Sequence, residues 1–156
     1  MTTRPSTEAI EANDVQRARL ARLIAGAGTA DLERIVHGEW TVAAKLAHLA
    51  YWDRFVLLLL ERWTRAEDYV ADQLPHWYDD CLNDALLVES LALEPAVAAR
   101  LALEAAEAID ARLRSLEPER ADRLLTDRDA EWLLRRHRHR AEHLDEIEGI
   151  LGPTGG

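Results

Sequence analysis

The chain has 156 residues, of which 48% are apolar, and a formal net charge of −10 from 29 acidic and 19 basic side chains. This length and apolar content fit one domain that spans residues 1–156 and has its own core. The acidic balance argues against a nucleic-acid partner, because such partners attract clustered Lys and Arg. The single cysteine excludes an internal disulfide and fits a reducing compartment.

Targeting and membrane signals are absent from the sequence. The N-terminus has no basic, apolar leader of the kind that directs secretion. The longest strongly apolar run is residues 55–60, far short of the roughly 20 residues that a membrane span needs. We therefore expect a soluble, cytoplasmic protein without a membrane partner.

The first helix is predicted over about residues 7–25, after a loose tail at residues 1–6. Ser and Thr near its start are good caps, and Gly26 and Gly28 end it. Residues 31–36 predict one more short turn of helix.

The second helix is predicted from Thr41, a good N-cap, to about Trp63. His48 lies in the middle of its apolar stripe, because the residues at helical spacing from it are Ala44, Trp52, Phe55 and Leu59. The opposite side is also apolar, with Leu46, Leu49, Leu57 and Leu60. A helix apolar nearly all round is central or covered by a second subunit, so we expect a homodimer.

A long connection is predicted over residues 65–94, with a possible short helix at residues 84–91. The third helix begins at Pro95, a favoured first-turn residue, and runs to about Ser115. A turn around residues 122–129 precedes the last helix. No segment has the alternation that predicts a strand.

The last helix is predicted as one element from Trp132 to Leu151, closed by Gly152 and followed by a loose tail at residues 152–156. His139 and His143 lie about one turn apart on its core side. Two imidazoles at this spacing can bind one metal ion. With His48 they form a candidate metal site between the second and last helices of an all-α four-helix bundle.

Three short motifs, in order along the chain, resemble those of the DinB-like superfamily of four-helix-bundle metalloproteins. They are residues 40–52 (WTVAAKLAHLAYW), residues 80–83 (DCLN) and residues 139–143 (HRAEH). The superfamily includes mycothiol-dependent maleylpyruvate isomerases and bacillithiol transferases. The resemblance spans about residues 10–151.

The resemblance implies metal ligands at His48, His139 and His143, with zinc or nickel as the metal. It also implies an up-down-down-up bundle, which needs a long connection between the second and third helices. It further suggests a low-molecular-weight thiol, such as mycothiol or bacillithiol, as a second cofactor.

Four further residues are candidates for binding a substrate or thiol. Arg136 and Arg140 flank the histidine face and could hold a carboxylate, although arginines at such positions more often pack on apolar surface. Trp52 could line the site or pack in the core, and Asn83 belongs to the second motif. His137 should face elsewhere, and no general base stands out.

Two functions remain open. In the first, a metal held by three histidines activates a thiol or water for transfer, isomerisation or hydrolysis of a small molecule. In the second, the chain is a non-catalytic metal- or ligand-binding module that acts through dimerisation.

Overall fold

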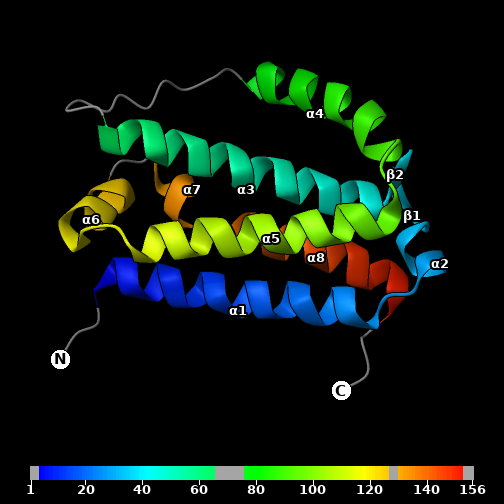
Figure 1. Cartoon of the computed structure of the whole chain (residues 1–156), viewed down its shortest axis with the longest axis horizontal. Coiled ribbons are helices and arrows are strands. Elements are labelled where there is room, and N and C mark those ends of the chain that lie inside the picture. Colours follow the sequence, from blue (N-terminus) through cyan, green and yellow to red (C-terminus); the bar gives the residue numbers. More distant parts are fainter. Residues whose placement is uncertain (1–3, 66–75, 127–129, 153–156) are drawn as a thin grey trace.

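The computed structural model describes residues 4–65, 76–126 and 130–152. The described chain is all-α, as predicted, except for a short hairpin (Figure 1). The four helices that surround the core are α1 (Pro5–Gly26), α3 (Val42–Arg65), α5 (Pro95–Arg114) and α8 (Arg136–Leu151). Both α1 and α3 contact α5 and α8, and α3 and α5 run opposite to α1 and α8.

Proline and threonine begin the helices where the sequence predicted them to. Pro95 is in the first turn of α5, and Pro5 takes the same position in α1, so the helix includes Ser6, which was predicted to lie in the tail. Thr41 caps α3, because its Oγ1 accepts a hydrogen bond from the backbone N–H of Ala44 over 3.1 Å. Most of the predicted tails lies outside the described residues.

A short helix and a hairpin replace the helical turn that was predicted over residues 31–36. The helix is α2 (Thr29–Leu32), and the antiparallel strands are β1 (Ile35–His37) and β2 (Trp40–Thr41). Gly38 in the connecting turn has φ 52°, which glycine adopts without steric cost. Strands this short have no readable alternation, which is why the prediction of no strand was wrong.

The last helix is broken, contrary to the prediction of one element. α7 (Glu131–Leu134) ends before Arg135, whose ψ of 53° leaves the helical region, and α8 begins with Arg136. Asn13 of α1 reaches this break. Its Nδ2 donates to the carbonyl of Leu134 over 2.8 Å, and its Oδ1 accepts from the N–H of His137 over 2.7 Å. The side chain thus satisfies backbone groups that a break would leave unpaired.

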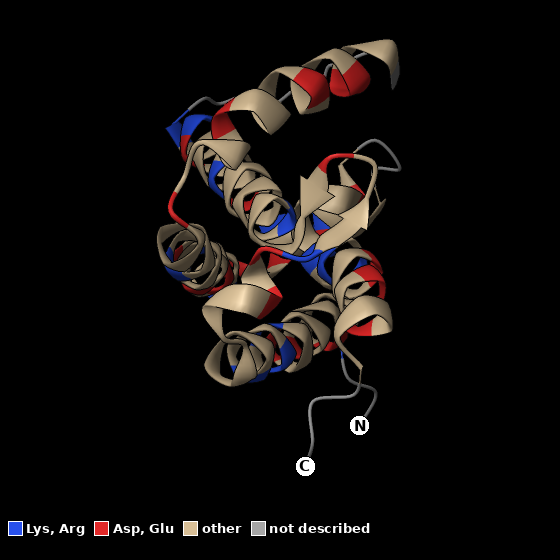
Figure 2. Cartoon of the chain, turned by 90° about the vertical axis from the view of Figure 1, so that its right-hand side faces the viewer, with Lys and Arg blue, Asp and Glu red and all other residues tan. Residues whose placement is uncertain are grey.

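One further helix is longer than predicted, and another was not predicted. α4 (His76–Leu91) extends well before the predicted residues 84–91, and α6 (Pro118–Thr126) occupies part of the predicted turn. Residues 66–75 of the predicted long connection lie outside the described residues. α4 packs on the outside of α3, with acidic residues along it (Figure 2), and Ser90 is its one buried residue in the described part. A helix that buries so little has a weak apolar pattern.

The core consists of two apolar clusters separated by a layer of buried charge. Along α3, Ala50 belongs to one cluster and Val56 to the other, and Asp53 lies between them. The buried polar residues of this layer are Asn13, Asp53, Asp110, Arg136 and Arg140. The layer joins α1, α3, α5 and α8 at the level of the break.

The leucines that led to the predicted homodimer are mostly covered within one chain. Leu46, Leu49 and Leu60 are at most 1% exposed, and Leu57 is half-buried. Their surface therefore no longer argues for a dimer, which stays a prediction. In the described residues, no helix combines the length and the apolar character needed to cross a membrane.

Candidate metal centre

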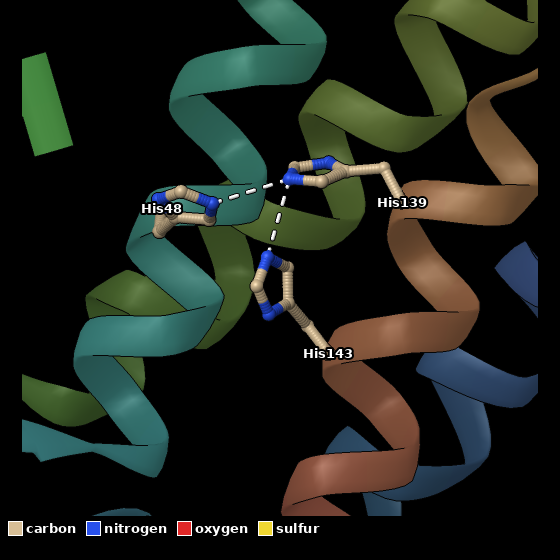
Figure 3. Close-up of side chains that lie close together, drawn as sticks. All are labelled: His48, His139 and His143. Carbon is tan, nitrogen blue, oxygen red and sulfur yellow. Dashed lines mark hydrogen bonds between the residues drawn. The ribbon is translucent and has the colours of Figure 1, made fainter. Parts of the chain in front are cut away.

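The three predicted ligands converge between α3 and α8 (Figure 3). Nε2 of His139 lies 3.1 Å from Nε2 of His48 and 3.2 Å from Nε2 of His143. His48 and His143 are buried at 6% and 8% exposure, and His139 is half-buried. One nitrogen from each ring thus faces a shared point, as the phases of the two helices predicted.

The spacing of these nitrogens fits a small divalent cation. A tetrahedral ion with nitrogen ligands at about 2.0–2.1 Å needs its ligand atoms roughly 3.4 Å apart. The two measured separations come close to that value without any movement of the helices. The donor set of three imidazoles suits a divalent transition metal and leaves at least one coordination position open.

The three imidazoles are neutral at physiological pH, as metal ligands must be. The pKa of His48 is lowered to about 3, mainly by burial, and the neighbouring His143 and Lys45 act in the same direction. Burial likewise lowers the pKa of His139 well below its usual value, with Arg136 the next contributor. The pKa of His143 is lowered by burial although Glu146 opposes the shift. A cation that binds at neutral pH therefore meets three uncharged rings.

A carboxylate lies behind one of the three rings. Nδ1 of His143 is 3.0 Å from Oε2 of Glu146, and Nζ of Lys45 is 2.8 Å from the same oxygen. Burial alone would raise the pKa of Glu146, but hydrogen bonds from Lys45 and His143 lower it overall. Glu146 is therefore ionised and can only accept, so the proton of neutral His143 is on Nδ1. Its Nε2 lone pair then points at the shared nitrogen cluster.

Arg136 and Arg140 lie in the charged layer of the core. Arg140 is 0% exposed and donates from Nη1 and Nη2 to the two carboxylate oxygens of Asp110 over 2.8 and 2.9 Å. Its Nε donates to Asp53 over 3.0 Å. Arg136, 3% exposed, donates from Nε to the other oxygen of Asp53 over 2.8 Å. Both guanidinium groups thus bind carboxylates inside the protein. Substrate binding by them stays a prediction, which this arrangement does not favour.

Trp52 and Asn83 are brought together beside the site. Nε1 of Trp52 donates to Oδ1 of Asn83 over 3.1 Å, which ties α4 to α3. The Trp52 ring lies 6.3 Å from the His48 ring between centroids, and Trp40 from the hairpin lies 5.6 Å from it. Two indoles therefore stand edge-on to His48. Whether Trp52 and Asn83 bind a substrate stays a prediction.

Four other residues on α3 and α8 bear on the site, two that point away from it and two that adjoin it. His137 faces Asn13 and not the three histidines, as expected. Glu142 is exposed. Lys45 and Glu146 also adjoin the site, and neither was predicted there. Their spacing in the sequence could have indicated this. Lys45 lies three residues before His48 and Glu146 three residues after His143, which places each pair of side chains on one helix face.

The fold and site define an all-α protein with a buried cluster of three histidines between two long helices. The family model of the DinB superfamily matches residues 12–147, which include all three histidines. The chain therefore belongs to the DinB superfamily. Comparison with curated proteins and with solved structures found no match.

Proposed function

We propose that the chain is a metal-dependent enzyme of the DinB type, in which His48, His139 and His143 hold a divalent zinc or nickel ion. The observation that carries the proposal is the convergence of three Nε2 atoms, one from each buried or half-buried ring. When bound, such an ion would favour the deprotonated form of a coordinated water or of a thiol such as mycothiol or bacillithiol. The reaction class is transfer, isomerisation or hydrolysis of a small molecule.

We further infer that residues 1–156 form one DinB-like domain whose long helices make an up-down-down-up four-helix bundle. The contacts among α1, α3, α5 and α8 and their relative directions support this topology (Figure 1). In such a bundle, ligands on facing helices meet in the interior.

The protein's own residues prepare the site in two ways. The charged layer fixes α8 against α3, because Asp53 of α3 bonds both Arg136 and Arg140 of α8. That register keeps His139 and His143 opposite His48. We propose that the Trp52–Asn83 pair, next to His48, contacts the substrate or thiol at the open coordination position.

Metal analysis of the purified protein tests the proposal. Protein produced without added metal and dialysed should retain close to one divalent ion per chain. Alanine substitution of His48, His139 or His143 should remove both the metal and the activity, because each forms the site itself. His37→Ala, exposed in β1, and His137→Ala, facing Asn13, should retain both and serve as controls. Full occupancy and turnover in His139→Ala would show that the assignment is wrong.

The second candidate function is a non-catalytic metal- or ligand-binding module that acts through homodimerisation. The supporting observation is exposed apolar surface on neighbouring helices, where Leu58 of α3 is 54% and Val88 of α4 is 72% exposed. Thiol consumption with a small electrophile separates the two candidates. Turnover that disappears in His143→Ala supports the enzyme. Metal binding without turnover, in a protein that sediments as a dimer, supports the module.

A further inference from the structure

The three histidines of the metal centre differ in what lies behind each ring. Nδ1 of His143 faces the carboxylate of Glu146 at 3.0 Å, and Nδ1 of His139 faces Nη2 of Arg136 at 3.1 Å. Nδ1 of His48 is buried and has no hydrogen-bond partner among the described residues. One ligand therefore has an anion behind it, one a cation and one neither.

The carboxylate behind His143 is itself held in place from the other ligand-bearing helix. Lys45 of α3 donates from Nζ to Oε2 of Glu146 over 2.8 Å, and the lysine is only 6% exposed. Its Nζ also lies 5.4 Å from the centroid of the Trp40 ring, which stands beside His48. The chain of contacts from Lys45 through Glu146 to His143 thus links α3 to α8 next to the metal centre.

We propose that Glu146, fixed by Lys45, is the positioning residue of the metal centre and makes His143 its anchoring ligand. The inference rests on the proposed function. A carboxylate that accepts from Nδ1–H fixes the tautomer and orientation of an imidazole and makes its Nε2 a stronger electron donor. The guanidinium of Arg136 has the opposite effect on His139, because it donates to Nδ1 and so holds the ring proton on Nε2, which must lose that proton to bind an ion. His143 therefore binds the ion more strongly than His139.

Affinity for cobalt or zinc is the direct test, measured by competition with a chelator of known affinity. Glu146→Gln removes the negative charge while it keeps the length of the side chain. We expect its dissociation constant to rise by about 10- to 100-fold. Glu142→Gln is the matched control, because Glu142 is exposed one turn earlier on α8 and its substitution changes the net charge equally. The control should bind like the wild type.

Two further measurements separate positioning from a general structural role. Lys45→Met should weaken binding in the same direction as Glu146→Gln, since it frees the carboxylate. The Co(II) absorption spectrum should change in both variants, and thermal unfolding of the metal-free proteins shows whether they are folded. A structural role alone would lower the melting temperature and leave the spectrum of bound cobalt unchanged.

Each outcome has a distinct meaning. If Glu146→Gln binds metal as tightly as Glu142→Gln does, the positioning role is wrong and the proposed function stands. If the wild-type protein binds neither cobalt nor zinc, the proposed function fails and the inference fails with it. If His139→Ala loses more affinity than His143→Ala, Glu146 does not make His143 the anchor.

Discussion

Arg136 donates a hydrogen bond from Nη2 to Nδ1 of His139 over 3.1 Å. A guanidinium has no acceptor, so Nδ1 of the neutral ring must accept, and the ring proton is on Nε2. His143, one turn later, has the opposite arrangement because Glu146 accepts from its Nδ1. Nε2–H of His139 can therefore be donated to Nε2 of His143 at 3.2 Å or of His48 at 3.1 Å. In the metal-free protein, the hydrogen on Nε2 of His139 thus links its ring to a neighbouring histidine at the point where the three rings meet.

The first prediction is that His139 and His143 are opposite tautomers in the metal-free protein. Two-bond ¹H–¹⁵N correlation spectra at pH 7.5 should show the proton on Nε2 of His139 and on Nδ1 of His143. The pattern of His139 should change in Arg136→Met, because that variant removes the donor to Nδ1. Identical tautomers for both rings in the wild type would contradict the assignment.

The second prediction concerns the pH dependence of the metal-free protein. Burial lowers the pKa of His48 from 6.5 in the unfolded chain to about 3 in the folded one. Between these values the unfolded chain binds a proton that the folded chain does not, so stability is highest above pH 6.5 and falls as the pH is lowered. Through this group, the free energy of unfolding should fall by about 1.4 kcal/mol for each pH unit below this value.

Thermal unfolding measures this effect, when the melting temperature is recorded with a chelator present at pH values between about 8 and 5. His48→Leu should make the dependence less steep, although His139 and His143 still contribute, whereas His37→Leu, at an exposed position, should leave it as in the wild type. A melting temperature of the wild type that does not change below neutral pH would refute the prediction.

The third prediction concerns the charged layer. Asp53→Ala leaves the Nε donors of Arg136 and Arg140 without their acceptor inside the protein. Because a buried charge without its partner is costly, we expect a loss of about 3–5 kcal/mol in the free energy of unfolding. Urea denaturation measures it. Glu104→Ala breaks an exposed ion pair with Arg100 and should cost at most about 1 kcal/mol. Equal losses in the two variants would argue against a stabilising role for the layer.

The helices and the convergence of the three histidines could be predicted because each leaves a local pattern. Pro95 and Thr41 mark helix starts through their own backbone chemistry, and they do so whatever packs around them. His48, His139 and His143 lie at phases that a regular helix fixes. For α3 and α8, helical periodicity was therefore enough to predict that the three side chains meet at one point.

The break before α8 and the charged layer could not be predicted in the same way, because distant residues determine them. Asn13 is 121 positions from Leu134, and nothing near Arg135 in the sequence signals the break. Arg140 was expected to hold a carboxylate at the site or to pack on apolar surface, because arginine rarely loses all its water. Only the tertiary structure shows that Asp53 and Asp110, from two other helices, satisfy its guanidinium in the interior.

The last prediction concerns Asn13, which joins α1 to the break between α7 and α8. Asn13→Ala removes both the donor to Leu134 and the acceptor for the N–H of His137, and the site is 0% exposed. Each unsatisfied buried group costs about 1–3 kcal/mol, so the variant should be less stable by roughly 2–5 kcal/mol. Glu11→Ala, exposed on the same helix, is the matched control and should unfold like the wild type.

Asn13→Ala should also weaken metal binding, since the break sets the direction in which α8 leaves α7 and therefore where His139 points. This second effect distinguishes Asn13 from an ordinary core residue. Chelator competition at a temperature where the variant is folded should show a dissociation constant above that of Glu11→Ala. If Asn13→Ala loses stability and binds metal with wild-type affinity, then α8 keeps its direction without this contact, and the charged layer alone holds the histidines in place.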